Sequence, residues 1–480
     1  MEDEKQRSEL VFVPAPALGH MASTIELANR LLSITNQHHR ISITILIVSF
    51  PYTDPNFASY FQSLPSIFPN IRFIILPPVD PPPLPAHVAI ETLVSLYCRK
   101  WTPQLKEALT QLTDSSPPIR LTGLVIDILF TDFIDVANQL GVPTFLNFTS
   151  NAAVLGLMLH LPTLHADHPK TTESFTELAI PSFANSVPPT VLPTPLLNKT
   201  DDSYKWYVHH CGRFRELQGI LVNTFPELES YAIDSFDSLS GAPKVYAVGP
   251  IVDLAGKGQL RPVGGSGEQE RIMKWLDRQP EGSVVLWGGV EGDCGGGGGE
   301  RVPVFVVVAE GAEVLGGREG GRGRSEGRVA GGVRGEGGGE GVVCGWVGQV
   351  EVLGHKAIGG FVSHCGWNSI LESLWFGVPI ATWPMYAEQQ LNAFYLVKEK
   401  GLAVEIRLDY RLKDYSLGCG GSGVVTAEEV ERGIRRVMEK DSEVRRRVKE
   451  MSVKSREAAR EGGSSSVSMK QFIEDLVNDN

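Results

Sequence analysis

Residues 363–369, SHCGWNS, combine the side chains of an anion-binding site. They follow a short apolar run at residues 360–362, and a helix is predicted to start within them. The N-terminus of a helix offers backbone N–H groups and the positive end of the helix dipole. With His364, Asn368 and Ser369 beside it, such a terminus can bind a phosphate group. The simpler alternative is a helix whose polar residues only cap its first turn.

Two further polar groups favour the binding site. Glu372 stands about one helical turn beyond this segment and can accept hydrogen bonds from ribose hydroxyls. Glu388 and Gln389 follow the apolar run at residues 378–383. The segment 363–369 with Glu372, and the pair Glu388 and Gln389, therefore each follow a predicted strand. Because ligands of open parallel sheets bind outside the carboxyl ends of the strands, the groups together predict a nucleotide site.

A third candidate lies near the start of the chain. His20 follows the apolar run LVFVPA, and Asp127 ends the strand-like run LTGLVID. A histidine titrates near neutral pH and can take a proton from a hydroxyl group. An aspartate beside it can hold its tautomer and stabilise its cation. Considered alone, a histidine in a turn is more often structural, so the residues by themselves leave both interpretations open.

These residues need strands and helices to position them. Short apolar, β-branched runs alternate with helix-length segments, which is typical of parallel sheets covered on both faces. Strands are predicted to begin near residues 10, 41, 71, 121, 143, 219, 245, 283, 359 and 378. Helices are predicted at 21–33, 269–277, 368–376, 388–400, 427–440, 444–460 and 469–477. We expect loops at 77–85 and 171–200, a linker at 256–267 and a flexible joint at 462–466. The pattern predicts an α/β protein with two doubly wound units and a cleft at their strand ends.

Composition narrows the class of protein. The 480 residues carry a net charge of −12, which argues against a nucleic acid or an anionic membrane as the main partner. The six cysteines are widely spaced and form no metal-binding motif, so we expect reduced thiols and a cytoplasmic protein. The start MEDEKQRSEL has no signal-peptide pattern, and no apolar run is long enough to span a membrane.

Residues 288–345 do not fit the rest of the chain. About two residues in five are glycine there, against a usual share of roughly 7%. Gly, Val, Glu, Ala and Asp, all encoded by codons that begin with G, make up nearly four-fifths of the segment. Natural linkers are richer in Ser, Thr, Pro or Lys. We therefore hypothesise a reading-frame error that starts near Leu286 and ends near Gln349; the alternative is a genuine glycine-rich insertion.

The stretch at residues 346–389, WVGQVEVLGHKAIGGFVSHCGWNSILESLWFGVPIATWPMYAEQ, resembles the 44-residue signature box of plant family 1 UDP-glycosyltransferases. The resemblance continues in VFVPAPALGHM, LVNTFPELES, VYAVGPI and WLDRQPEGSVV, and fails in the glycine-rich block. It implies two facing Rossmann-like domains of the GT-B type with an interdomain cleft. Residues 1–245 would bind the acceptor, residues 246–460 would bind the UDP-sugar, and a helix in residues 461–480 would pack back on the first domain.

The resemblance also implies a role for each matching residue. Trp346 would stack on uracil, and the backbone of Val347 would form a hydrogen bond with the base. The ribose would be held by Gln349 and Glu372, and the diphosphate by His364, Asn368 and Ser369. The sugar would be contacted by Trp367, Glu388, Gln389 and Thr149. A glutamine at the end of the box favours glucose over galactose.

The same resemblance resolves the role of His20. It matches the family's base, with Asp127 as its partner, and would deprotonate an acceptor hydroxyl that attacks the anomeric carbon with inversion. We expect UDP-glucose and a small lipophilic acceptor (flavonoid, phenolic or terpenoid) as substrates, without a cofactor or metal. We also expect a monomer that binds no nucleic acid and has no stable membrane insertion.

Two departures from the family pattern matter. The family's Trp-Ala-Pro-Gln is WVGQ here, and the expected Phe-Gly-Ser turn after Val285 is replaced by LWGG, so the serine that approaches the diphosphate is absent. The helix and strand that should follow are missing or replaced, although residues 302–309 resemble a strand. An impaired UDP-binding homologue is therefore an alternative. The run GGREGGRGRSEGR suggests nucleic-acid binding, but acids outnumber arginines in its block. A dehydrogenase is disfavoured because no GxGxxG lies between a strand and a helix in the first unit.

Overall fold

The computed structural model describes residues 7–38, 41–50, 55–83, 88–115, 119–167, 177–239, 241–256, 265–291, 303–309, 333–334, 340–344, 347–411 and 425–478. Contacts divide the chain into two compact units. Unit 1 holds the described residues of 7–253 and 455–478, and unit 2 holds those of 254–411 and 425–454. Each unit has its own sheet.

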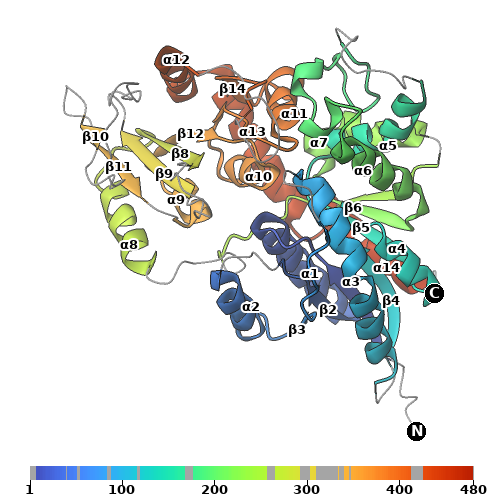
Figure 1. Ribbon diagram of the computed structural model, residues 1–480. Coiled ribbons are helices and arrows are strands. Elements are labelled where there is room, and N and C mark those ends of the chain that lie inside the picture. Colours follow the sequence, from blue (N-terminus) through green and yellow to red (C-terminus); the bar gives the residue numbers. More distant parts are fainter. Residues whose placement is uncertain are drawn as a thin grey trace. The chain divides into compact units, whose positions relative to one another are not determined.

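The sheet of unit 1 has the strand order β3-β2-β1-β4-β5-β6-β7, with every neighbouring pair parallel (Figure 1). Its strands are β1 (Arg7–Val13), β2 (Ile41–Ile47), β3 (Ile71–Ile75), β4 (Ile119–Ile126), β5 (Thr144–Phe148), β6 (Gly219–Val222) and β7 (Lys244–Ala247). The order reverses between β1 and β4. In doubly wound sheets this reversal is the place where ligands bind, outside the carboxyl ends of the strands.

Helices cover the sheet of unit 1. They are α1 (Leu18–His38), α2 (Pro55–Ile67), α3 (Ile90–Thr113), α4 (Phe133–Gln139), α5 (Ala152–Asp167), α6 (Asp202–Arg213), α7 (Pro226–Ser235) and α14 (Ser464–Asn478), with short 3-10 turns at Pro189–Val191, Thr194–Leu196, Phe214–Glu216 and Phe236–Ser238. Helix α3 packs on α4 and α6, whereas α14 packs on α1, β4 and β7. Phe472 of α14 is fully buried and meets the rings of Phe145 and Tyr246 edge-on.

The sheet of unit 2 has the order β10-β11-β9-β8-β12-β13-β14 (Figure 1). Its strands are β8 (Val284–Glu291), β9 (Pro303–Ala309), β10 (Val333–Arg334), β11 (Glu340–Cys344), β12 (Ile358–Ser363), β13 (Ile380–Thr382) and β14 (Ala403–Glu405). Its helices are α8 (Gly265–Leu276), α9 (Gln349–Leu353), α10 (Trp367–Phe376), α11 (Gln389–Phe394), a π-helical turn (Tyr395–Lys400), α12 (Ala427–Met438) and the larger part of α13 (Glu443–Ala459), whose residues from Ser455 on belong to unit 1. Apolar side chains of β8, β12, β13, β14 and α12 form one core cluster.

Among the described strands of this second sheet, four are parallel. β8, β12, β13 and β14 follow the doubly wound pattern, whereas β9, β10 and β11 are antiparallel to their neighbours. The strand-like run at 302–309 does form a strand, β9, but it pairs antiparallel with β8. A parallel strand needs a crossover connection, usually a helix, between it and its partner. The described parts of the glycine-rich block contain strands and no helix.

Most predicted elements are confirmed, and two segments were predicted wrongly. The predicted joint at 462–466 is largely helical, because α14 begins at Ser464. Ser464 Oγ donates to Glu227 and Ser465 Oγ donates to the Gly249 carbonyl, so the serines anchor this helix start. The predicted linker at 256–267 ends earlier than expected, since α8 begins at Gly265; residues 257–264 lie outside the described part.

Candidate functional site

His20 and Asp127 lie in direct contact at the strand-order reversal of unit 1. His20 is in the first turn of α1, after β1, and Asp127 directly follows β4. Nδ1 of His20 lies 2.7 Å from Oδ2 of Asp127. The Asp127 side chain is 2% exposed, while the His20 side chain is 33% exposed. Because an ionised carboxylate only accepts hydrogen bonds, this contact assigns the proton to Nδ1 and leaves Nε2 of a neutral ring as the basic nitrogen.

Thr149 joins this pair from the end of β5. Its Oγ1 lies 3.3 Å from Nδ1 of His20. Thr149 belongs to the short segment between β5 and α5, which is held by a buried acid. Oε2 and Oε1 of Glu229 accept hydrogen bonds from the backbone N–H groups of Ala152 (2.8 Å) and Ala153 (3.1 Å). Glu229 is fully buried and caps the N-terminus of α5, so its carboxylate fixes the backbone next to Thr149.

The loop after β12 has a constrained backbone. Cys365 has a φ of 65°, in the left-handed region that is costly for a residue with a side chain. Two contacts hold it there: Cys365 N–H donates to Ser363 Oγ at 3.0 Å, and Asn392 Nδ2 donates to the Cys365 carbonyl at 3.0 Å. Asn392 is fully buried in α11. These two contacts stabilise the conformation in which the loop leads into α10.

His364 lies against the start of α10. A Cβ on Gly366, the residue that precedes α10, would stand 2.4 Å from Nε2 of His364. Burial lowers the pKa of His364 to about 4, although the ring keeps some exposed surface. The ring is therefore neutral at pH 7. It can offer a phosphate group a hydrogen bond beside the positive end of α10 without carrying a charge of its own.

The predicted ribose residues are already in contact. Nε2 of Gln349, at the start of α9, donates to Glu372 Oε2 at 2.6 Å and to Ser369 Oγ at 2.9 Å. Glu372 and Ser369 are both 9% exposed. With its nitrogen engaged in this way, Gln349 keeps its carbonyl oxygen without a partner among the described residues. That oxygen can accept a hydrogen bond from a ribose hydroxyl.

The side-chain amide oxygen of Gln389 forms hydrogen bonds within the loop after β13. Its Oε1 accepts from the backbone N–H groups of Met385 (2.9 Å) and Tyr386 (3.1 Å). These two donors identify Oε1 as the oxygen and direct Nε2 elsewhere; Nε2 has no acceptor in the described part of the chain. Glu388 precedes α11, next to Ala387 with its φ of 56°. Because β12 and β13 are adjacent and Asn392 bonds the β12 loop, these residues lie near the start of α10.

Three predicted donor residues need comment. Trp346 lies outside the described residues. Val347 as a whole residue is 1% exposed, and its predicted contact with the base uses the backbone. Trp367, at the first position of α10, is 2% exposed as a whole residue, so its side chain is almost fully buried. Asn368, the next residue of this turn, is partly exposed.

Sequence reasoning missed two residues that shape these sites. Glu229 and Asn392 each hold a loop that carries a predicted site residue. Their partners are backbone atoms far away in the sequence, so residue type and spacing gave little sign of them. Within the predicted segment 363–369, Ser363 Oγ accepts from Cys365 N–H, and Gly366 leaves room for the His364 ring.

Two further observations bear on the chemistry. Within the described ranges, no group of three or more His, Cys, Asp or Glu side chains is arranged to hold a metal ion. In that same part of the chain, no helix is both long and apolar enough to cross a membrane.

Comparison with known proteins gives consistent matches. The family model described as UDP-glucoronosyl and UDP-glucosyl transferase matches residues 336–412. The chain is 42% identical to UDP-glycosyltransferase 71K1 of Malus domestica, with 99% of this chain and 100% of that protein covered. It is 41% identical to flavonol 3-O-glucosyltransferase UGT71C4 of Arabidopsis thaliana, with 99% of each covered. The crystal structure of Medicago truncatula UGT71G1 complexed with UDP-glucose has a TM-score of 0.80 and 38% identity, and covers 99% of this chain and 100% of its own.

The structural match confirms the predicted fold class, an α/β fold of the GT-B type with a parallel sheet in each unit. In unit 2 the parallel part is β8, β12, β13 and β14, the strands that carry the HCGWNS loop and the loop of Glu388 and Gln389.

Proposed function

Because this chain belongs to the plant family 1 UDP-glycosyltransferases and is a UDP-dependent glycosyltransferase of plant small molecules, we propose that it transfers glucose to a hydroxyl of a flavonoid or a related phenolic. The printed names of two relatives support the substrates: one is a flavonol 3-O-glucosyltransferase, and the other was crystallised with UDP-glucose. In this proposal unit 1 binds the acceptor and unit 2 binds the UDP-sugar.

The main support for the proposed mechanism is the contact between His20 and Asp127. With Nδ1–H bonded to the buried carboxylate of Asp127, Nε2 is the nitrogen that can act as a base, and the His20 side chain is 33% exposed. Nε2 takes the proton of the acceptor hydroxyl as its oxygen forms a bond to the anomeric carbon. The bond from that carbon to the β-phosphate oxygen breaks, UDP leaves, and the configuration inverts. Asp127 stabilises the imidazolium that forms.

The leaving group is proposed to bind at the start of α10. His364, Asn368 and Ser369 would surround the diphosphate, where the helix dipole favours the growing negative charge. Gln349 and Glu372 would hold the ribose, and Gln389, through Nε2, would donate to a sugar hydroxyl. Trp346 would stack on uracil, with Val347 bonding the base through its backbone; Trp367, Glu388 and Thr149 would complete the contacts to the sugar.

Three described cysteines, Cys98, Cys211 and Cys365, are buried and free. This supports a reducing compartment, and we propose the cytoplasm as the site of the reaction.

The direct test is mass spectrometry of products formed from UDP-glucose and a panel of flavonols, simple phenols and terpenoid alcohols. We expect a mass gain of one hexose on phenolic acceptors, and a fall in kcat on the order of 10²–10⁴ for His20→Gln with little change in KM for UDP-glucose. A His20→Gln variant as fast as the parent would refute the role of His20. Product from UDP-galactose in preference to UDP-glucose would refute the sugar assignment.

A second candidate is a UDP-binding homologue with little or no turnover. The composition of residues 288–345 and the antiparallel pairing of β9 with β8 favour it. Calorimetric titration with UDP separates the two: binding without product on any acceptor supports the impaired homologue. Resequencing the gene across codons 286–349 decides whether the segment is a frame error. Assaying the frame-corrected chain beside the present one shows how much turnover the present segment removes.

A further inference from the structure

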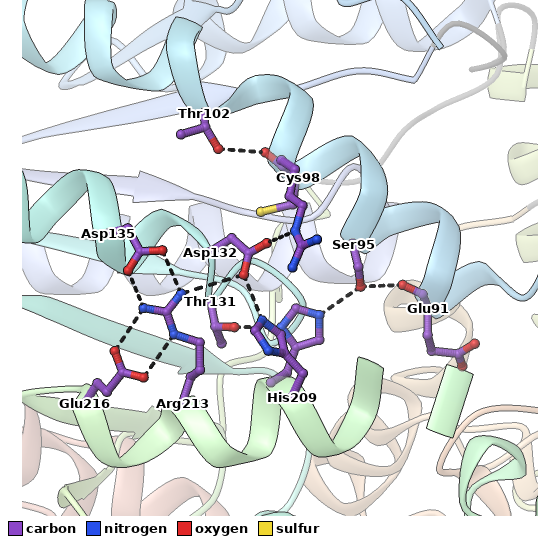
Figure 2. Close-up of polar contacts among 12 residues, drawn as sticks. Glu91, Ser95, Cys98, Thr102, Thr131, Asp132, Asp135, His209, Arg213 and Glu216 are labelled. Carbon is purple, nitrogen blue, oxygen red and sulfur yellow. Dashed lines mark hydrogen bonds and ion pairs between the residues drawn. The ribbon is translucent and has the colours of Figure 1, made fainter. Parts of the chain in front are cut away.

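The loop between β4 and α4 begins at Asp127 and ends in a group of charged side chains. We call this group the Asp132 cluster: Asp132 with Arg99, His209 and Arg213. Arg99 Nε donates to Asp132 Oδ2 at 2.6 Å, and His209 Nε2 lies 2.8 Å from Oδ1. Arg213 Nη1 lies 3.6 Å from the same Oδ1. Figure 2 shows Asp132 between His209 and Arg213, above helix α6.

The preceding residue, Thr131, is held separately by a buried histidine. Thr131 Oγ1 lies 2.7 Å from His210 Nδ1, and His210 Nε2 lies 2.8 Å from Ser95 Oγ. Ser95 Oγ donates to the Glu91 carbonyl, so it must accept from His210 Nε2–H. His210 Nδ1 then accepts the Thr131 hydroxyl proton. Burial lowers the pKa of His210 to about 3, which keeps the ring neutral and this chain of hydrogen bonds intact near pH 7.

Charge balance keeps Asp132 ionised in this setting. Burial by itself raises the pKa of Asp132, but the hydrogen bonds from Arg99 and His209 outweigh it and hold the pKa below the usual value. The Asp132 side chain is only 11% exposed. Its partners come from α3 and from α6, so one carboxylate ties the loop to two helices at once.

The middle of the loop is fixed as well. Phe130 N–H donates to the Asp127 carbonyl at 3.0 Å, and the Phe130 ring is fully buried against Trp101 and Phe133. The loop from Asp127 to Asp132 is therefore held by the turn between Asp127 and Phe130, by the buried ring of Phe130, and by the polar contacts of Thr131 and Asp132. A shift at Asp132 has to move Asp127 or break these contacts, because interiors packed this closely transmit displacement.

We propose that Asp132 is a positioning residue for the reaction: by binding Arg99, His209 and Arg213 it fixes the loop that carries Asp127, and so fixes the orientation of His20. The inference rests on the proposed roles of His20 and Asp127. The competing explanation is that the cluster only joins α3, α4 and α6 and has no effect on His20.

Asp132→Asn tests this, with Asp135→Asn as the matched control. Asp135 also bonds Arg213, through Nη2 at 2.6 Å, but it lies inside α4, beyond the loop, and its side chain is 61% exposed. For Asp132→Asn we expect kcat to fall about tenfold, since a misplacement of about 1 Å can cost up to 10²-fold. KM for UDP-glucose should change less than about twofold, because the residues proposed to bind the UDP part lie in unit 2. Asp135→Asn should keep kcat within about twofold.

Two further measurements separate positioning from stability. The acidic limb of the pH dependence of kcat/KM should move to lower pH in Asp132→Asn, because a displaced Asp127 stabilises the imidazolium less. In an Asp127→Asn background, adding Asp132→Asn should lower kcat by less than about twofold, since both changes act on one contact. Full additivity, or an unchanged pH profile, would leave Asp132 with a structural role only.

Hydrogen exchange measured by mass spectrometry gives a readout that needs no turnover. The peptide spanning residues 124–135 should exchange faster in Asp132→Asn than in Asp135→Asn or the parent. If Asp132→Asn does not fold, Arg99→Gln replaces it, because the Arg99 side chain is 55% exposed and Asp132 keeps two partners. If the parent enzyme shows no turnover, the proposed function is contradicted. If the parent is active, and Asp132→Asn and Asp135→Asn have the same hydrogen exchange and the same kcat, only the inference about Asp132 is contradicted.

Discussion

The ring of His364 rests where a side chain on Gly366 would be: a Cβ at Gly366 would stand 2.4 Å from Nε2 of His364. Gly366 has φ −62° and ψ 138°, which any residue can adopt, so its backbone does not require glycine. Glycine is needed at position 366 because a side chain there would occupy the place of the His364 ring. Gly366 therefore contributes to the proposed anion site by leaving room for His364 at the start of α10.

Gly366→Ala is expected to displace the His364 ring while leaving the fold intact. The clash is with the end of a side chain, which can rotate away, so Tm should fall by only a few degrees. The affinity for UDP should drop about tenfold as one hydrogen bond to the diphosphate is lost. Calorimetric titration with UDP measures this. Gly267→Ala is the control: this exposed position in α8 has open space for an added Cβ, and the variant should bind as the parent does. Equal affinity in the two variants would contradict the role of the ring.

Gln389→Glu separates the two ends of the Gln389 amide. The new carboxylate keeps an oxygen for the N–H groups of Met385 and Tyr386, but replaces the donor Nε2 with an acceptor. We expect a lower Tm, because residue 389 is only 4% exposed and a buried carboxylate is costly. We also expect a rise of about tenfold in KM for UDP-glucose, with a smaller effect on the affinity for UDP, which lacks the sugar. Steady-state kinetics and UDP titration on the same preparation provide the comparison. An equal loss for UDP and UDP-glucose would place Gln389 away from the sugar.

Glu229→Gln is expected to loosen the segment that carries Thr149. The amide offers one acceptor where Ala152 and Ala153 present two donors, so one buried N–H loses its partner. Such a loss costs about 1–3 kcal/mol. We expect a lower Tm together with a lower kcat, because Thr149 lies 3.3 Å from His20. Asp234→Asn, an exposed acid on the same helix, should change neither quantity. A drop in Tm with full kcat would make Glu229 purely structural.

Stability should fall as the pH drops from 7 to 5, and His210 should account for part of that fall. Burial lowers its pKa from 6.5 to about 3. Between these values the unfolded chain binds a proton that the folded chain excludes, so the stabilisation is complete above pH 6.5 and is lost below it. For His210 the loss between pH 7 and 5 is about 2 kcal/mol.

The variant His210→Asn removes this titration. The difference in Tm between pH 7 and pH 5 should shrink by several degrees relative to the parent, whereas the difference between pH 7 and pH 8 should stay the same. His364, whose pKa burial lowers to about 4, still titrates and leaves part of the acid effect in place. An identical acid response in parent and variant is incompatible with a neutral buried His210.

Local pattern was sufficient for most of the elements. The apolar runs that predicted strands are the strands β1–β8, β12 and β13 within a few residues, because continuous β-branched segments bury both faces of a parallel sheet. The same kind of pattern did not predict the direction of β9. A valine-rich run is compatible with either direction, and the partner and the connection decide between them. At Ser464 a glycine–serine run that looked flexible starts a helix because tertiary partners bond its serines.

The candidate site divides in the same way. His20, Asp127, His364 and Gln389 were identified from residue type and from their place after a predicted strand. Glu229 and Asn392 were not, since each acts on a loop far away in sequence through backbone atoms. The same holds for Asp132, whose partners lie 33 to 81 positions away.

The sequence by itself determined the family, the alternation of strands and helices and the identity of the chemical groups, because apolar periodicity and motif spacing are local properties of the chain. Only the tertiary structure decided that β1 lies beside β4, which brings His20 to 2.7 Å from Asp127 across 107 positions. It also decided which buried polar groups hold these residues in place. Those contacts depend on strand order and on helix packing, and buried polar atoms take whichever partners the assembled fold brings within hydrogen-bond distance.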